Sequence, residues 1–251
     1  MGWHAPTVWV RVDMSGRAGP KQPVHGSPVD VPKPSIGARH ARRAALAALA
    51  AGTVILGSAP SGQAAVSSFG SDLAKPATVV EAHGPDTAFW NARIGGNFDR
   101  GKAPAGGQVT LVKVKGNVLA DPDNRVHPDP QFHFQVLHPV GNRVVKVELS
   151  SGAFRLPVGG SSQVVNSFQP VNLCVHKGDF VDFNDIGGAE WAWGPYPGMP
   201  FQVFAAADDA TTDVYSENDG TNVGSQWAPQ QEKHDRELLL QSTLATGPDA
   251  T

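Results

Sequence analysis

Apolar and polar residues alternate one by one along several stretches of this sequence, and this alternation restricts the fold more than any other feature. Successive side chains of an extended strand point to opposite faces, so strict alternation is typical of a strand with one buried and one solvated face. In one stretch, Val145, Val147 and Leu149 would share the buried face. The stretches with this pattern, which we predict to be half-buried β-strands, are Thr110–Lys115, Gln131–Val136, Val144–Leu149 and Val171–His176.

Turn-forming residues separate these stretches from one another and from further strand candidates. The additional candidates are Phe180–Asp185, Phe201–Ala205 and Arg236–Leu244. Glycine-containing turns lie between the runs, for example at 105–107, 141–142, 159–160 and 177–179. Roughly seven to nine short strands without helical periodicity predict an all-β protein, namely an antiparallel β-sandwich of jelly-roll type. The segment Gln230–Leu240 fits either a helix or a closing strand.

Composition excludes two other classes of fold. The 251 residues include 28 Gly and 21 Pro, and only 17% are charged. A coiled coil or a helix bundle needs abundant Glu, Lys and Leu at helical spacing, so both are excluded. A single cysteine cannot close an intramolecular disulfide, which excludes a disulfide-stabilised scaffold. A chain of this length can bury a core of its own, and we expect one folded domain.

A basic cluster, an apolar run and a segment of small residues follow one another near the beginning, as in a secretory signal peptide. The basic cluster 39–43 precedes the uncharged run Ala44–Gly57 and the small polar segment Ser58–Ala64. The run of 14 residues is shorter than the roughly 20 that cross a bilayer. We predict a signal peptide over 36–64, cleaved after Ala64, with an uncleaved N-terminal anchor as the alternative. The other predicted segments are 1–35 (disordered, or a misassigned start), 65–244 (the β-sandwich domain) and 245–251 (a flexible tail).

Charge narrows the range of partners. The first 64 residues carry seven of the 20 basic and two of the 23 acidic residues, which leaves 13 basic and 21 acidic residues in 65–251. A domain with this acidic balance lacks the basic face that nucleic acid requires, and it disfavours anionic membrane surfaces. We therefore expect no nucleic-acid partner. From the predicted signal peptide and its short apolar run we expect no membrane span in the mature chain, and a location outside the cell or at the cell envelope.

Four short segments and their order carry a family resemblance. They are Ser68–Leu73, Gly106–Val109, Phe132–Val136 and Val171–Asp179, the last of which contains Lys177-Gly178-Asp179. This order resembles a group of uncharacterised exported proteins of GC-rich Gram-positive-type bacteria. Members of that group resemble single jelly-roll domains that follow a signal peptide. Late in their chain they have a hairpin in which Lys-Gly-Asp lies between two strands. The resemblance implies the fold and export, and it implies no activity or catalytic residue.

An aromatic cluster late in the chain is the strongest candidate for a binding site. Trp191 and Trp193 are two residues apart, so on an extended segment both rings would face the same side. Flat rings on a Gly/Pro loop suit the C–H face of a sugar, and nearby carboxylates suit its hydroxyl groups. We predict that Trp191, Trp193 and Tyr196 stack on a glycan while Asp185 and Glu190 hydrogen-bond to it. Alternatively, the tryptophan rings close one end of the sandwich.

Acidic residues gather at predicted loops, which include 182–185, 208–209 and Asp213. Alternating Asp and Asn side chains can supply some of the six to eight oxygen ligands of Ca²⁺. Asp121, Asp123 and Asn124 lie in such a stretch, although it lacks the glycine and the terminal glutamate of an EF-hand loop. Two interpretations remain open for these three residues, a structural Ca²⁺ site or solvated turn carboxylates.

Catalytic motifs are weak in this sequence. The spacing of His127, His133, His138 and His176 does not match the His-x-His arrangement of a cupin-type metal site, and surface histidines explain it more simply. Cys174 lies within a predicted strand, and no Gly-x-Ser-x-Gly motif occurs. The sequence therefore favours a non-catalytic protein that binds an extracellular or envelope ligand such as a glycan. The alternatives are a structural or protein-interaction domain of the envelope and a metal-dependent jelly-roll enzyme.

Overall fold

The computed structural model describes residues 65–84, 86–120, 130–187, 192–193, 196–197, 199–216 and 222–247. The predicted leader and the residues from 248 onward lie outside these ranges. Every strand pair within the described residues is antiparallel, and no helix occurs among them. The predicted all-β class and the antiparallel β-sandwich are confirmed.

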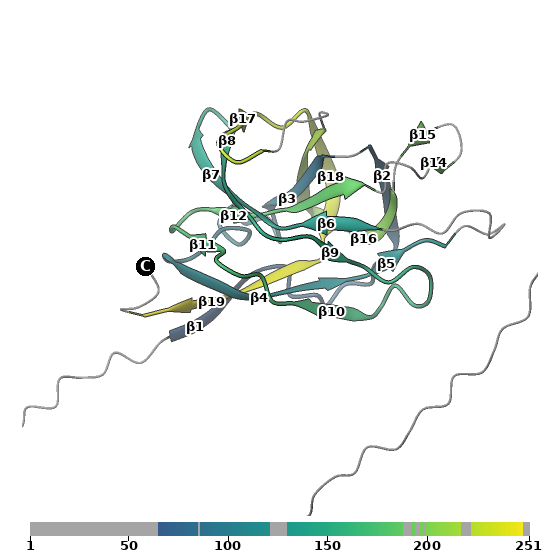
Figure 1. The fold of residues 1–251 in the computed structure, drawn as a ribbon, viewed down its shortest axis with the longest axis horizontal. Helices are drawn as coiled ribbons and strands as arrows, with labels where there is room; N and C mark the ends of the chain where they lie inside the picture. Colours follow the sequence, from purple (N-terminus) through teal and green to yellow (C-terminus); the bar gives the residue numbers. More distant parts are fainter. Residues whose placement is uncertain are drawn as a thin grey trace, which may run out of the picture. The chain divides into compact units, whose positions relative to one another are not determined.

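The described residues form three sheets and one short hairpin (Figure 1). The five-stranded sheet contains β1 (Ala65–Gly70), β19 (Leu240–Thr246), β4 (Gly107–Lys115), β10 (Val165–Phe168) and β11 (Cys174–Val175). The four-stranded sheet contains β12 (Phe180–Val181), β7 (Gln135–Gly141), β8 (Val144–Ser150) and β17 (Gln226–Trp227). The eight-stranded sheet contains β18 (Gln231–Leu238), β16 (Met199–Ser216), β3 (Thr87–Arg93), β13 (Phe183–Gly187), β6 (Gln131–His133), β9 (Phe154–Arg155), β2 (Val79–His83) and β5 (Asn117–Val118). The hairpin pairs β14 (Ala192–Trp193) with β15 (Tyr196–Pro197).

The main core lies between the five-stranded and the eight-stranded sheets. Val112 of β4 and Leu244 of β19 are buried together with Phe132, Phe183 and Phe204 of the eight-stranded sheet. The rings of Phe132 and Phe183 stack with their centroids 4.5 Å apart. Burial of each such side chain contributes roughly 1.5–3 kcal/mol, so this aromatic layer is a principal source of stability.

The eight-stranded sheet also buries its second face, against the four-stranded sheet. A second core cluster joins residues of both sheets: Ala88, Trp90 and Tyr215 from β3 and β16, Leu137, Val145, Val147 and Phe180 from β7, β8 and β12, and Trp227 from β17. In contrast, Phe89 and Val214 belong to the main core. Neighbouring residues of β3 therefore enter different cores, and the five residues from Thr87 to Asn91 are all buried.

The predicted single strand over Gln131–Val136 is divided at Phe134. β6 ends at His133 in the eight-stranded sheet, and β7 begins at Gln135 in the four-stranded sheet. Phe132, Phe134 and Val136 are buried as predicted. Gln135, which we expected on a solvated face, is buried because the chain passes from one sheet to another at this point.

Alternation also fails at a bulge in β4. Leu244 pairs with Val109 and Thr243 pairs with Leu111, so Thr110 is an extra residue on its strand. As a result Thr110 is exposed and Val109 is buried, whereas the sequence had grouped Thr110 with Val112. An extra residue of this kind shifts the inward and outward order by one position.

Three other expectations need correction. Val171, expected to share the buried face of Leu173 and Val175, is 75% exposed because the strand here is only β11. The helix alternative for Gln230–Leu240 is wrong, since β18 occupies most of that segment. β19 continues to Thr246, two residues into the expected tail. Among the described residues, no helix has the length and apolar character needed to cross a membrane.

Candidate functional site

The residues predicted from the sequence to bind a ligand are only partly described. Trp193 and Tyr196 face each other in the backbone register of β14 and β15, and nothing is described of their side chains. Trp191 and Glu190 lie outside the described residues, as do the predicted Ca²⁺ ligands Asp121, Asp123 and Asn124. Asp185 is fully buried in β13, paired in register with Thr87 and Phe132. The proposed roles of these residues stay predictions.

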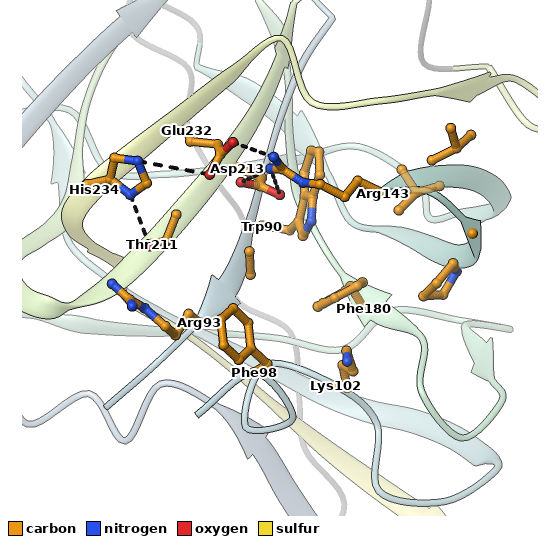
Figure 2. A pocket seen from close by; sticks show the side chains of 15 residues that line it. Trp90, Arg93, Phe98, Lys102, Arg143, Phe180, Thr211, Asp213, Glu232 and His234 are labelled. Atoms are coloured by element: carbon orange, nitrogen blue, oxygen red, sulfur yellow. Dashed lines mark hydrogen bonds and ion pairs between the residues drawn. The ribbon is translucent and has the colours of Figure 1, made fainter. Parts of the chain in front are cut away.

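The structure reveals a different site, a pocket of about 490 Å³ between the eight-stranded and the four-stranded sheets (Figure 2). One wall consists of β3, β16 and β18, and the other of β7, β8 and β12. The residues that line the pocket are Trp90, Ala92, Arg93, Phe98, Lys102, Pro139, Gly141, Arg143, Val144, Val145, Phe180, Thr211, Asp213, Glu232 and His234. This volume is within the range of about 300–1,000 Å³ that small-molecule sites occupy.

The apolar part of the pocket belongs to the second core cluster. Trp90, Val145 and Phe180 are all members of that cluster and line the cavity from the two facing sheets. Behind them, Trp227 packs against Trp90 with ring centroids 5.5 Å apart, and it stacks on Tyr215 at 4.3 Å. The aromatic series Trp90, Trp227 and Tyr215 supports the apolar surface of the pocket from behind.

Strand register brings polar groups into two rows across the sheet wall. Asp213 of β16 pairs with Trp90 of β3 on one side and with Glu232 of β18 on the other. Two residues earlier along β16, Thr211 pairs with Arg93 and with His234. On β16 and β18 the two rows are two residues apart and therefore share a face. On β3 a register shift brings Arg93, three residues after Trp90, into the second row, and both rows line the same cavity.

Two carboxylates that directly face each other across strands repel, and Arg143 compensates this repulsion. Figure 2 shows the guanidinium of Arg143 directed at both acids. Its Nη1 donates a hydrogen bond to Glu232, and its Nη2 lies 3.4 Å from both carboxylate oxygens of Asp213. Arg143 and Asn142 have φ angles of 64° and 50°, which suit the two central positions of the tight turn between β7 and β8. The turn therefore connects the four-stranded sheet to the opposite wall.

Burial controls the ionisation of this group. Desolvation raises the pKa of Asp213 to about 6, and the negative charge of Glu232 adds to the rise, although Arg143 opposes it. The hydrogen bond from Arg143 lowers the pKa of Glu232, which is more exposed. Asp213, only 7% exposed, is therefore the carboxyl group of this pair that can hold a proton near pH 6.

The loop after β3 supplies the other side of the pocket. Phe98 is 63% exposed and lies across the space from Glu232, next to Lys102 (Figure 2). The loop is anchored by a bridge between Ile94 and Asn97 and by the Gly96 N–H, which donates to the Asp209 carbonyl over 2.8 Å. In Figure 2 the accessible ring of Phe98 and the carboxylates of Asp213 and Glu232 lie on opposite sides of the pocket.

This pocket was not predicted from the sequence. Asp213 was expected in a loop, whereas it is a buried residue within β16. The only available signal was the turn at 141–142, directly before Arg143. No family model, curated protein or solved structure matches the chain.

Proposed function

We propose that this protein is an exported, non-catalytic β-sandwich that binds a glycan in the pocket between β3, β8, β16 and β18. The observation that carries the proposal is the placement of Phe98 opposite Asp213 and Glu232, with Arg143 between the two sheets. Export is inferred from the predicted signal peptide over 36–64, and the glycan would be met outside the cell or at the envelope.

The chemistry of the lining fits one face and one edge of a sugar ring. A pyranose has an apolar C–H face, which packs on aromatic and aliphatic side chains such as those of Phe98, Phe180 and Val144. The hydroxyl groups of the sugar can donate to the carboxylates of Asp213 and Glu232 and accept from the guanidinium of Arg143. All three side chains end in a planar polar group. The Lys102 and Arg93 side chains add positive charge at the rim, so a sugar with an acidic substituent is the preferred form.

The experiment is a binding titration with three groups of compounds, followed by ligand-observed NMR and calorimetry. The groups are neutral oligosaccharides, oligosaccharides that contain uronic acids, and small aromatic carboxylates. We expect a saccharide to bind and Phe98→Ala or Asp213→Asn to weaken it at least tenfold, because each change removes one half of the recognition surface.

Two further variants make the result specific. Val171→Ala changes an exposed apolar residue outside the pocket lining and should leave affinity unchanged. Trp193→Ala tests the aromatic segment predicted from the sequence as the binding surface. Loss of binding in Trp193→Ala but not in Phe98→Ala would move the glycan site to that segment. Binding of aromatic carboxylates without any saccharide would refute the glycan assignment.

A further inference from the structure

Three side chains that could ligate a metal converge at the junction of two sheets. The Nδ1 atom of His138 lies 2.7 Å from Oδ1 of Asp179, and the Nδ1 atom of His176 lies 3.6 Å from Oδ2 of the same carboxylate. One candidate ligand atom from each of the three residues lies within 4.8 Å of the others. Asp179 is completely buried, whereas the His176 side chain is 82% exposed. The group therefore combines a buried carboxyl group with an accessible imidazole that is free to rotate.

The backbone fixes the buried carboxylate before any ion is present. Phe180 pairs with Leu137, and this register places Asp179 opposite His138. Asp179 also closes the turn that begins at His176: its N–H donates to the His176 carbonyl over 3.2 Å, and its Oδ2 accepts from the His176 N–H over 2.6 Å. The Ala103 N–H donates to the Asp179 carbonyl, and the Gly178 N–H donates to the Ala103 carbonyl, at 2.8 and 2.9 Å.

We propose that His138, His176 and Asp179 form a binding site for a divalent transition metal ion, with Zn²⁺ as the best fit. Two imidazoles and one carboxylate are ligands that Zn²⁺ prefers, whereas Ca²⁺ prefers oxygen ligands only. With bonds of about 2.0–2.1 Å and tetrahedral angles, ligand atoms are roughly 3.3 Å apart. The two nitrogen–oxygen distances, 2.7 and 3.6 Å, lie on either side of that value. All three ligand atoms lie within 4.8 Å of one another, and rotation of the exposed His176 side chain would close the remaining gap.

The further hydrogen bonds made by the proposed metal-binding side chains support the same assignment. Metal-bound carboxylates are usually held by a further hydrogen bond, and the His176 N–H provides this bond to Asp179. Nδ1 of His138 is in hydrogen-bond contact with the Asp179 carboxylate, so a bound ion would take the place of this contact. Three protein ligands leave a fourth position for water.

The position of the site indicates what the ion would do. His176 directly follows β11 of the five-stranded sheet, and Asp179 directly precedes β12 of the four-stranded sheet, which also contains His138 in β7. An ion bound here links the two sheets at the turn between them. A ligand that binds only the folded state stabilises it, so the ion raises the midpoint of thermal unfolding.

The test uses the full chain and Co²⁺ as a spectroscopic substitute for Zn²⁺. We expect one Co²⁺ to give the intense visible absorption of tetrahedral coordination, Zn²⁺ to displace it, and Zn²⁺ to raise the unfolding midpoint. His176→Ala removes an exposed ligand, and His138→Gln retains a hydrogen-bond donor to Asp179 while it removes the ring nitrogens. Each substitution should weaken Zn²⁺ binding at least tenfold and abolish the thermal shift.

The chain has nine histidines, so a matched control is required. His234→Ala removes another exposed histidine, one that lines the pocket, and should bind Co²⁺ and Zn²⁺ as the unmodified protein does. The proposal is overturned if the unmodified protein binds neither ion at 1 mM. It is equally overturned if binding and the thermal shift survive either His176→Ala or His138→Gln.

Discussion

The side-chain amide of Asn91 hydrogen-bonds to both backbone groups of Leu238. Nδ2 of Asn91 donates to the Leu238 carbonyl over 2.7 Å, and its Oδ1 accepts from the Leu238 N–H over 2.9 Å. Both residues are buried. The side-chain amide of Asn91 in β3 thus donates to and accepts from the backbone of β18, as the peptide group of a neighbouring strand does elsewhere in the sheet. It therefore connects two of the three strands that form one wall of the pocket.

Asn91→Ala should lower the free energy of unfolding by about 2–4 kcal/mol, because it leaves a buried N–H and a buried carbonyl without partners. Chemical denaturation measures the loss. Asn166→Ala is the control, since Asn166 makes one part-buried hydrogen bond, from Nδ2 to the Gly116 carbonyl over 2.8 Å. We expect about 1 kcal/mol for that change. Equal losses in the two variants would contradict the role assigned to Asn91.

Gly116→Ala should reduce stability by about 3 kcal/mol or more, or prevent folding. Gly116 has a φ of 140°, and a Cβ at this position would lie 2.1 Å from the Gln202 carbonyl oxygen and 2.9 Å from Cα of Val203. The obstacle is backbone and cannot rotate away. In Gly84→Ala the new methyl group meets no atom within 4 Å, so that variant should unfold close to the unmodified midpoint. A Gly116→Ala protein of normal stability would show that β5 can move away from β16.

Ionisation of Asp213 should lower the free energy of unfolding as the pH rises from about 4 to 6. Burial raises its folded-state pKa from 3.8 to about 6, so in this range the folded state holds a proton that the unfolded state has released. The full contribution is roughly 3 kcal/mol at 1.36 kcal/mol per pKa unit. Denaturation of Asp213→Asn at several pH values isolates it, since the stability difference between the two proteins should change with this sign.

Two other buried groups, His83 and Asp182, also contribute to the pH dependence of the free energy of unfolding. Burial lowers the pKa of His83 to about 4, so His83 makes stability rise between about pH 4 and 6.5. Burial also raises the pKa of Asp182, which acts in the same direction as Asp213. Both are present in Asp213→Asn and cancel in the difference. A stability difference that does not change with pH for Asp213→Asn would refute the assignment.

Arg143→Gln should destabilise the protein by about 1 kcal/mol at pH 7, because Asp213 and Glu232 then face each other without a shared cation. The loss should shrink at pH 4, where protonation of Asp213, whose pKa is raised to about 6, removes the repulsion. Thermal or chemical unfolding at both pH values provides the measurement. Arg100→Gln removes a single surface ion pair, at 2.8 Å from Asp72, and should change stability by less than Arg143→Gln at pH 7. A pH-independent loss would argue against charge compensation by Arg143.

The outer strands of the fold could be predicted from the sequence because only one of their faces is buried. In β8, Val145 and Val147 are buried and Lys146 is half-exposed, as the alternation predicted. β3 escaped prediction for the opposite reason. Phe89 enters the main core and Trp90 the second core cluster, so its sequence shows a continuous buried run without alternation.

The pocket could not be predicted because its residues meet through register between distant strands. Trp90, Asp213 and Glu232 form one row, although they are far apart in the chain. Hydrophobic pattern indicates which face of a strand is buried, and it does not indicate which residue lies opposite which on the next strand. A bulge such as that at Thr110 shifts the register further.

The pairing of β1 with β19 has a mechanical consequence. Ala65 lies opposite Thr246 at one end of this antiparallel pair, so the chain enters and leaves the described domain at neighbouring points. Hydrogen bonds of antiparallel strands run across the pair. A force that pulls the two ends apart therefore breaks the hydrogen bonds of this pair one after another, from Ala65 toward Gly70. Under tension the domain should open first between β1 and β19, at a lower force than if all these bonds had to break together.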